Sequence, residues 1–371
     1  MRIGLIKETK PAERRVGLTD AGVATLVGEG HEVLVETGAG LGAGIGDSAY
    51  ELAGAKLVGT TDAWGAELAV KVKEPIASEY QYLGEDTTLF TYLHLAADRP
   101  LTDALLDAKV TGIAYETVED ERRGLPLLTP MSEIAGRLAA HAAGQYLMHP
   151  YGGPGLLLGG SPGVAPAKVV VLGGGVVGTQ AASLAVGMHA DVTVLDVSPR
   201  RVRELGDHFG NTARVLQSDP ATLLAQITEA DVVIGAVLVP GAAAPKLVSR
   251  ADLAKLRPTA LLIDVAIDQG GCFETSRPTT YDAPTYEVEG IVHYCVANMP
   301  GAVPQTSTKA LTNATLPYVR RLANRGVDTA LSDDAGFARG LNTRAGALTH
   351  EAVAAAFPDA SSTAHPATSS P

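Results

Sequence analysis

Residues 169–196 constrain the fold of this chain more than any other stretch of its sequence. The apolar run Val169–Leu172 has the length and composition of a buried strand, and a cluster of glycines follows it. Val177–Met188 is rich in alanine, as is typical of a helix, and Val192–Leu195 is a second apolar run. Strand, turn, helix and strand in this order predict a βαβ unit and therefore a parallel sheet.

The glycines in that turn, Gly173, Gly175 and Gly178, have the spacing G-x-G-x-x-G. The first permits a tight turn, the second lets the backbone approach a pyrophosphate, and the third lets the helix pack closely against the strand. The helix N-terminus attracts the negative charge of the pyrophosphate. Asp196 ends the second strand, where a carboxylate binds the hydroxyl groups of a ribose. Together these features predict a dinucleotide site.

The identity of the dinucleotide depends on charge. A carboxylate at Asp196 repels a 2′-phosphate and favours NAD over NADP, whereas Arg200 or Arg201 could bind such a phosphate. A simpler interpretation is a glycine-rich turn without a ligand, in which Asp196 is a solvated residue or a helix cap. We favour the NAD site, because all its elements occur in the required order.

Composition excludes several classes of protein. The 371 residues, 46% of them hydrophobic, suffice for two domains. A net charge of −12 argues against nucleic acid as a partner, because a polyanion needs clustered Lys and Arg. Residues 169–188 carry no charge, but their glycines would break a membrane-spanning helix, so we expect no membrane segment. The sequence begins without an apolar leader and has only two cysteines, so we expect a cytoplasmic protein. Cys272 and Cys295 do not have the spacing of a metal site, so we expect no bound metal.

Strand-like runs alternate with helical patterns in two series along the chain. The strand candidates of the first series are Ile3–Ile6, Glu32–Glu36, Leu68–Val72, Thr88–Leu93 and Val110–Tyr115. Those of the second series are Val169–Leu172, Val192–Leu195, Ala213–Leu216, Val232–Ile234 and Leu261–Val265. The alternation predicts the α/β class, with two doubly wound Rossmann-like domains and a cleft between them.

Two long helical patterns suggest how the chain passes between these domains. Met131–Met148 could lead into the second domain, and a pattern over residues 307–324 could lead back to the first. We therefore expect a discontinuous substrate domain of residues 1–128 and 307–371 around an NAD-binding domain of residues 129–306. The polar tail from about residue 358 is expected to be disordered.

Three polar residues of the first series follow strand candidates, where open α/β sheets bind their ligands. Arg15 lies in the loop after the first strand, Lys73 after Leu68–Val72, and His94 after Thr88–Leu93. Arginine can bind a carboxylate with two parallel hydrogen bonds, lysine can polarise a carbonyl oxygen, and histidine can transfer a proton near neutral pH. This set suits a small oxo or amino acid, although any one of these residues is more often structural or solvated.

The sequence resembles the alanine dehydrogenase family over residues 1–350, and the resemblance extends well beyond the glycine turn. The segments that carry it are KETK, ERRVGLT, GHEVLVETGAG, VKVKEP, LHLA, TPMSEIAGRLAA, GAVLVPGAAAPKLV, VAIDQGGCFETSRPTT, YCVANMPGAVP, TST and ALTNATLPY. The tail after about residue 357 matches nothing in the family pattern.

The resemblance implies a reaction and a set of site residues. The reaction is the reversible, NAD-dependent conversion of L-alanine and water to pyruvate and ammonium by a homohexamer. Arg15 and Lys73 would hold the substrate, His94 would act as acid and base, and Asp268 would share that work and stabilise an iminium. The implied cofactor contacts are Ser132, Val176, Val177, Asp196, Arg201, Ser218, Val237, Leu238, Val265, Ala266, Ile267, Asp268, Val296, Ala297, Asn298 and Met299. Position 201 is a lysine in the family pattern, so Arg201 is a departure that keeps the charge.

Three other functions compete with this one. The NAD-holding module of a proton-translocating transhydrogenase shares the early motifs but would not need His94 and Asp268 together. A saccharopine-type dehydrogenase has a similar layout, yet the ERRVGLT, VKEP and LHLA segments fit the alanine dehydrogenase family better. A sensor that binds NAD without turnover is the third alternative.

Overall fold

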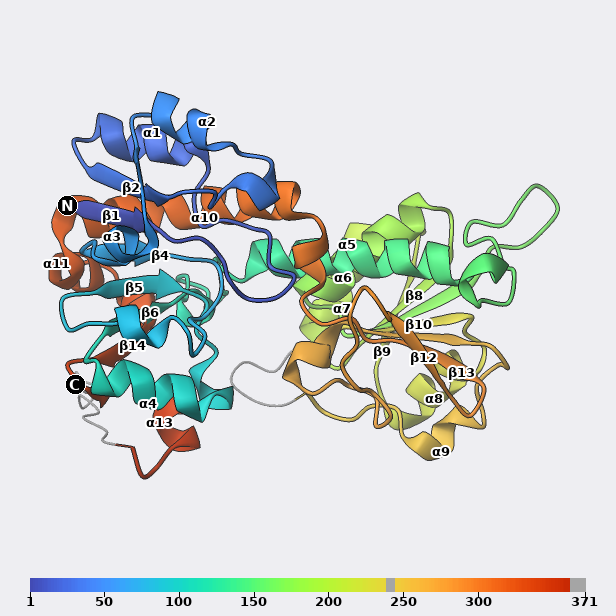
Figure 1. Ribbon diagram of the computed structural model, residues 1–371. Helices are drawn as coiled ribbons and strands as arrows, with labels where there is room; N and C mark the ends of the chain where they lie inside the picture. Colours follow the sequence, from blue (N-terminus) through green and yellow to red (C-terminus); the bar gives the residue numbers. More distant parts are fainter. Residues whose placement is uncertain (238–243, 361–371) are drawn as a thin grey trace. The chain divides into compact units, whose positions relative to one another are not determined.

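The computed structural model describes residues 1–237 and 244–360, and these residues form two compact α/β units (Figure 1). Unit 1 consists of Met1–Met131 and Gly301–Pro371, and unit 2 of Ser132–Pro300. The changes of domain predicted after residues 128 and 306 compare with divisions after residues 131 and 300. The helix α5 (Thr129–Tyr146) begins in unit 1 and continues into unit 2.

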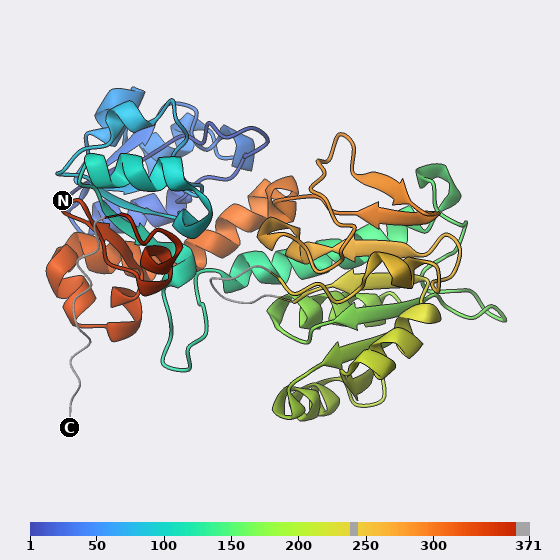
Figure 2. The ribbon, with the colours of Figure 1, turned by 90° about the horizontal axis from the view of Figure 1, so that it is seen from below.

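Unit 1 contains a mostly parallel sheet of eight strands within the described residues. Its strands are β1 (Arg2–Leu5), β2 (Glu32–Glu36), β3 (Lys56–Val58), β4 (Leu68–Val70), β5 (Thr88–Thr91), β6 (Thr111–Ala114), β14 (Leu341–Arg344) and β15 (Ala347–Leu348). Their order in the sheet is β15-β14-β6-β5-β4-β1-β2-β3, and β14 pairs antiparallel with both β6 and β15. Figures 1 and 2 show the red C-terminal residues returning to the blue and cyan N-terminal part of this unit.

The described residues of unit 1 contain eight helices besides α5. They are α1 (Asp20–Gly28), α2 (Asp47–Leu52), α3 (Thr60–Trp64), α4 (Arg99–Asp107), α10 (Pro304–Arg325), α11 (Val327–Ser332), α12 (Ala335–Ala338) and α13 (Glu351–Ala356). Short 3₁₀ turns are η1 (Leu41–Ala43), η2 (Tyr80–Tyr82), η3 (Leu95–Ala97) and η4 (Tyr115–Thr117). The N-cap of α1 is Thr19, whose hydroxyl accepts a hydrogen bond from the Gly22 amide, as is typical of a helix N-cap.

Unit 2 contains a seven-stranded sheet within the described residues. Its strands are β7 (Lys168–Leu172), β8 (Asp191–Asp196), β9 (Arg214–Gln217), β10 (Val232–Gly235), β11 (Leu261–Asp264), β12 (Thr285–Val288) and β13 (Ile291–Tyr294). Its helices and 3₁₀ turns are η5 (His149–Tyr151), α6 (Val176–Gly187), α7 (Pro199–Phe209), α8 (Pro220–Thr228), α9 (Arg250–Leu253), η6 (Val265–Gln269) and η7 (Met299–Ala302), the last of which ends in unit 1. The order is β12-β13-β11-β10-β7-β8-β9, and β12 alone runs antiparallel to its neighbour.

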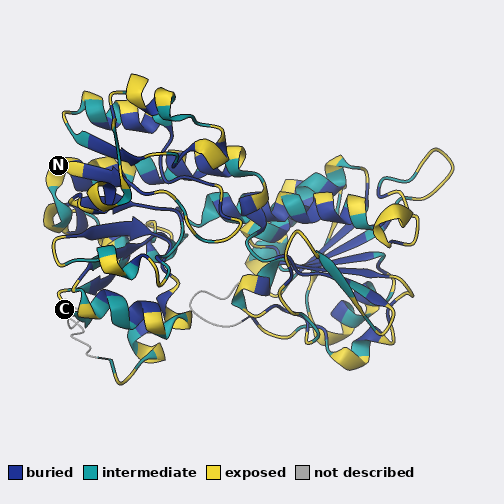
Figure 3. Cartoon of the chain, viewed as in Figure 1, coloured by how far each residue is buried: buried dark blue, intermediate teal, exposed yellow. Residues whose placement is uncertain are grey.

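Burial follows the parallel sheets. The central strands are mostly dark blue in Figure 3, while the outer faces of the helices carry much of the yellow. In unit 2 the alternate apolar residues of the strands that face α5 and α6 form one core with the alanines of these helices, and the intervening strand residues form a second core. The two-unit Rossmann-like α/β architecture predicted from the sequence is therefore confirmed.

Five predicted strands end earlier than the apolar runs indicate: β1, β6 and β11 by one residue, and β4 and β5 by two. β4 ends at Val70 rather than Val72, and the Val72 amide donates to the Glu8 carboxylate at 2.6 Å. β5 ends at Thr91 rather than Leu93, whose amide donates to Glu116 at 3.2 Å. β11 ends one residue early, at the cap of η6. The first amide after β4 and the first after β5 still pair with the neighbouring strand, because Lys71 donates to the Phe90 carbonyl and Tyr92 to the Val72 carbonyl. The acidic side chains receive the amides that follow.

The C-terminal prediction needs a correction at its start. Asp359 forms an ion pair with Arg99 at 2.8 Å, so the fold extends to residue 360 rather than ending near residue 357. The rest of the predicted tail, 361–371, lies outside the described residues. Within the described ranges, no helix combines the length and apolar character needed to cross a membrane.

Candidate active site

Both sheets reverse their strand order beside the first strand of the unit. In unit 1, β2 and β3 lie on one side of β1, and the next strand in sequence, β4, lies on its other side. In unit 2 the same switch occurs between β7 and β10. Open α/β sheets bind ligands at the carboxyl ends of the strands at such a switch point. Each unit therefore has one edge where a ligand is expected.

The switch point of unit 1 gathers the residues that the sequence singled out. Arg15 lies in the loop after β1, Lys73 follows β4, and His94 follows β5. These strands are parallel neighbours in the order β1-β4-β5, so their carboxyl ends lie at the same edge of the sheet. Three residues that are far apart in sequence thus come to one edge.

Arg15 is held by an acid two residues before it. Its Nε donates to Oε1 of Glu13 at 2.7 Å and its Nη2 donates to Oε2 at 2.5 Å, while Nη1 contacts the Met131 sulfur at 3.1 Å. Both charged side chains are nearly fully buried, with 2% and 1% exposure. Burial alone would lower the pKa of Arg15, but the hydrogen bonds and charge of Glu13 raise it above its ordinary value. The guanidinium therefore stays charged.

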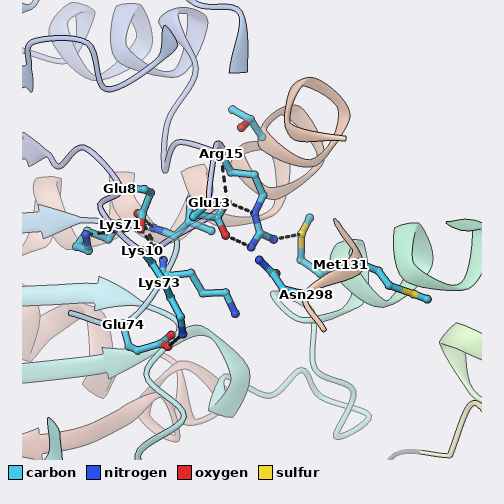
Figure 4. A network of polar contacts seen from close by, with 12 residues as sticks. Glu8, Lys10, Glu13, Arg15, Lys71, Lys73, Glu74, Met131 and Asn298 are labelled. Atoms are coloured by element: carbon cyan, nitrogen blue, oxygen red, sulfur yellow. Dashed lines mark hydrogen bonds and ion pairs between the residues drawn. The ribbon is translucent and has the colours of Figure 1, made fainter. Parts of the chain in front are cut away.

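A second buried set joins the ends of β1 and β4 (Figure 4). The Glu8 carboxylate accepts from the Val72 amide at 2.6 Å and the Lys73 amide at 3.4 Å, and lies 3.6 Å from the Lys71 ammonium. Lys71 also donates to Glu79 at 2.9 Å. Burial raises the pKa of Glu8, against the lowering by Lys71. This set fixes the backbone from which Lys73 projects.

His94 stands at the end of β5 in an unusual conformation. Its φ is +51°, in the left-handed region that few residues other than glycine adopt. The Glu116 carboxylate, in the turn after β6, accepts from the His94 amide at 2.6 Å and lies 3.8 Å from Nδ1 of the ring. Almost half of the side chain is exposed, at 45%. Such strained, exposed residues are concentrated at functional sites.

In unit 2 the glycine turn has the geometry that its spacing predicts. Gly173 has a φ of +96°, and a Cβ on Gly178 would lie 1.8 Å from the Gly173 carbonyl oxygen. A Cβ on Gly175 would meet no heavy atom of the described residues within 4 Å, which leaves space at the N-terminus of α6. The turn therefore fits a pyrophosphate, since the helix N-terminus provides amides and a favourable dipole.

Asp196 and Arg201 both hold the same turn. The Asp196 carboxylate accepts from the amides of Gly174 at 2.7 Å and Ser198 at 2.8 Å. The Arg201 Nε donates to the Gly174 carbonyl at 2.7 Å, and its Nη2 donates to Thr179 at 2.9 Å. A carboxylate at this position suits a ribose that has a free 2′-hydroxyl.

The other predicted cofactor residues follow the strands of unit 2. Ser132 lies in the first turn of α5, Ser218 follows β9 and Val237 follows β10, while Leu238 lies outside the described residues. Val265, Ala266, Ile267 and Asp268 form η6 after β11, and Val296, Ala297, Asn298 and Met299 follow β13. The two last groups are in contact, because the Asn298 amide donates to Asp268 at 3.2 Å.

The acidic partners of these residues were missed by the sequence analysis. Glu8, Glu116 and Asp264 lie within three residues of the end of a strand, and Glu13 lies in the loop after β1. The pairing of Glu13 with Arg15 could have been predicted, since only one residue separates them in the sequence. For Glu8 and Glu116 the partners come from another strand, which the sequence pattern does not identify.

The strand order and the glycine turn define a Rossmann-type oxidoreductase fold. Two family models match this chain. The model described as "Alanine dehydrogenase/PNT, N-terminal domain" matches residues 4–135, and "Alanine dehydrogenase/PNT, C-terminal domain" matches residues 139–351. The chain belongs to the alanine dehydrogenase/PNT family.

Curated relatives and solved structures agree with this assignment. The chain is 54% identical to "Alanine dehydrogenase" of Bacillus subtilis, over 95% of this chain and 94% of the relative. It is 55% identical to the protein of that name from Halomonas elongata, over 96% and 97% of the two chains. A solved "L-alanine dehydrogenase" superposes with a TM-score of 0.93 at 53% identity, over 97% and 99% of the chains. A transhydrogenase from Sinorhizobium meliloti superposes with a TM-score of 0.80 at 26% identity, over 95% and 100%.

Proposed function

We propose that this chain catalyses the reversible oxidative deamination of L-alanine to pyruvate and ammonium, with NAD as cofactor. The observation that carries the proposal is the gathering of Arg15, Lys73 and His94 at the switch point of unit 1. The relatives named alanine dehydrogenase, at 52–55% identity over almost the whole chain, support the same reaction.

Arg15 and Lys73 are proposed to bind the substrate. A guanidinium matches the geometry of a carboxylate, and Glu13 fixes its plane. Lys73, whose backbone Glu8 holds, provides a point charge for the oxygen of the oxo acid. A small acid with a carboxylate beside a carbonyl needs these two contacts.

His94 and Asp268 are proposed to handle protons and charge. The reaction passes through a hemiaminal and a cationic iminium of the substrate. His94 would take a proton from the attacking water or return one to the leaving group. Asp268, as a carboxylate, would stabilise the iminium and orient the amine.

NAD is proposed as the cofactor because the glycine turn and Asp196 of unit 2 suit a dinucleotide. The N-terminus of α6 and the open space at Gly175 would hold the pyrophosphate, and Asp196 would bind the ribose hydroxyls. NAD supplies a hydride acceptor when bound. The remaining contacts would come from the segments after β9, β10, β11 and β13.

We also propose a cytoplasmic homohexamer, as the family resemblance implies. Cys272 and Cys295 are both free and buried, which suits a reducing compartment. Light scattering of the purified protein should give six times the chain mass, and a monomeric mass would contradict the assembly.

The second candidate is an NAD-holding module of a transhydrogenase, which the 26% identity to a solved transhydrogenase favours. One assay separates the two. Purified protein with pyruvate, ammonium and NADH should lose the NADH absorbance if it is an alanine dehydrogenase. Binding of NADH without any loss would favour the transhydrogenase module or a sensor. Turnover that requires 2-oxoglutarate and lysine would indicate a saccharopine-type enzyme.

A further inference from the structure

The turn that follows Asp268 is built from two glycines in a conformation that side chains disfavour. Gly270 and Gly271 have φ values of +88° and +76°. A Cβ on Gly271 would also lie 2.6 Å from the Asp264 carboxylate. The turn comes directly after η6, the short 3₁₀ segment that carries Asp268. Its conformation therefore determines where η6 ends.

Lys246 binds the carbonyl side of this turn. Its ammonium donates to the carbonyl oxygens of Gly270 at 2.5 Å, Gly271 at 2.7 Å and Phe273 at 3.3 Å. An ammonium has three N–H donors, so these three contacts use its full capacity. Hydrogen bonds from a charged donor are stronger than those between neutral groups.

Asp264 binds the amide side of the same turn. Its buried carboxylate accepts from the amides of Cys272 at 2.9 Å and Phe273 at 3.3 Å, and from the Ser276 hydroxyl at 2.5 Å. It also caps η6, because its other oxygen accepts from the Ala266 amide at 3.1 Å. One carboxylate thus joins the start of η6 to the turn after it.

Backbone hydrogen bonds attach the segment around Lys246 to the same turn. The Ala244 amide donates to the Gln269 carbonyl at 3.0 Å, and the Leu247 amide donates to the Cys272 carbonyl at 2.7 Å. Residues 244–248, which lead from β10 toward α9, therefore lie along residues 269–274. Lys246 sits in the middle of this contact, with its ammonium on the turn.

We propose that Lys246 and Asp264 are positioning residues that fix the η6 turn and thereby place Asp268 for the reaction. The proposal rests on the role of Asp268 given under the proposed function. Asp268 is exposed and belongs to η6, a segment of only five residues. The Asn298 amide contacts its carboxylate at 3.2 Å, and the two charged groups Lys246 and Asp264 hold the ends of the segment that carries it. A displacement of about 1 Å in a reacting group can cost roughly a hundredfold in rate.

Lys246→Met removes the carbonyl contacts and is the first test. We expect kcat for pyruvate reduction to fall roughly ten- to a hundredfold, with little change in the melting temperature of this partly exposed site. Lys246→Arg should recover much of the loss, since a guanidinium also donates several hydrogen bonds. Lys255→Met is the matched control, because Lys255 lies in the same unit and pairs with Asp252 at 2.9 Å. It should keep the wild-type kcat.

A double-mutant cycle with Asp268→Ala tests whether Lys246 acts through Asp268. If it does, Lys246→Met should have little further effect on the residual kcat of Asp268→Ala. An equal fold-loss in both backgrounds would make Lys246 a general structural residue and overturn the proposal. Wild-type turnover in Asp268→Ala would instead remove Asp268 from the mechanism, and the positioning role with it. Should Lys246→Met not fold, Lys246→Gln gives the same comparison.

Discussion

The Glu13 carboxylate lies side-on against the Arg15 guanidinium, with Nε–Oε1 and Nη2–Oε2 distances of 2.7 and 2.5 Å. Both side chains are buried and only one residue separates them in the sequence. Fork-to-fork contacts of this kind fix the plane of a guanidinium as well as its charge. Glu13 thus determines the direction in which Arg15 can present hydrogen-bond donors to a substrate.

Glu13→Gln should weaken both substrate binding and the fold. The amide keeps one acceptor but no charge, which leaves a buried guanidinium without its counterion. We expect the free energy of unfolding to fall by about 3 kcal/mol and the KM for pyruvate to rise roughly tenfold. Urea unfolding and steady-state kinetics measure the two effects. Glu85→Gln, at an exposed pair with Lys109, is the control and should change neither appreciably.

Glu116→Ala should release His94 from its strained conformation. The change removes the acceptor of the His94 and Leu93 amides, so the end of β5 can relax. We expect kcat to fall roughly tenfold with a smaller change in KM, and faster hydrogen exchange at both amides. Glu119→Ala, at the Arg339 ion pair, is the comparison. Unchanged exchange in Glu116→Ala would show that Glu116 does not hold His94.

Asp196→Ala should act on the cofactor rather than on the substrate. The substitution removes the carboxylate that would bind the ribose and that accepts a hydrogen bond from the Gly174 amide. We expect the KM for NAD to rise tenfold or more, which corresponds to one charged hydrogen bond, and the KM for alanine to stay near its normal value. Asp191→Ala, at the other end of β8, removes a carboxylate paired with Arg214 and serves as control. Equal effects of the two variants on NAD would contradict the assignment.

Gly178→Ala and Gly187→Ala are a matched pair within α6. A Cβ at Gly178 would collide with the Gly173 carbonyl oxygen and push the helix away from the strand. We expect Gly178→Ala to lower the free energy of unfolding by about 1–3 kcal/mol and to abolish NADH binding. At the exposed end of the helix, Gly187→Ala should be neutral or stabilise by up to about 1 kcal/mol. Thermal unfolding and NADH fluorescence measure these outcomes. A Gly178→Ala protein that binds NADH normally would refute the close-packing argument.

His293 should make the protein less stable in mild acid. Burial lowers the pKa of this side chain below 6.5, with an opposing effect of Asp264 and a further lowering by Arg277. The unfolded chain therefore takes up a proton near pH 6.5 that the folded chain resists. The contribution of neutral His293 to the free energy of unfolding is complete above pH 6.5. It is lost as the pH falls from 6.5 toward the pKa of His293 in the folded protein.

Urea unfolding between pH 7.5 and 5 measures this effect. In the wild type the free energy of unfolding should decline below pH 6.5, and His293→Gln should make that decline shallower. Burial lowers the pKa of His293 although its Nδ1 lies 2.9 Å from the Ile291 carbonyl, a contact that raises it; Nε2 lies 2.7 Å from the Thr275 hydroxyl. An unchanged slope in the variant would exclude His293 as its source. His350, whose pKa burial also lowers, would then account for the slope.

The glycine turn could be predicted because its signal is local. Gly173, Gly175 and Gly178 are needed for backbone reasons that act within a few residues, so their spacing identifies the turn without knowledge of the rest of the fold. The same holds for α6, which begins and ends one residue before the predicted Val177–Met188. Apolar runs located ten of the parallel strands to within two residues at either end.

Other features could not be read from local patterns. The short strands β3, β12, β13, β14 and β15 were missed, since strands of two to four residues at or near a sheet edge have weak apolar periodicity. The acidic partners were missed for another reason. Glu8 reaches the Val72 amide, which lies on a different strand, and Glu116 reaches the end of β5 from the end of β6.

The sequence by itself therefore determined the two α/β units, the glycine turn with Asp196, and the polar residues at strand ends. Only the tertiary structure decided which of those strand ends are neighbours, because β4 adds beside β1 rather than beside β3. That order brings Arg15 and Lys73 to one switch point and sets Glu13, Glu8 and Glu116 against the backbone and charges they hold. Apolar periodicity reports burial, whereas the pairing of charges depends on which strands lie side by side.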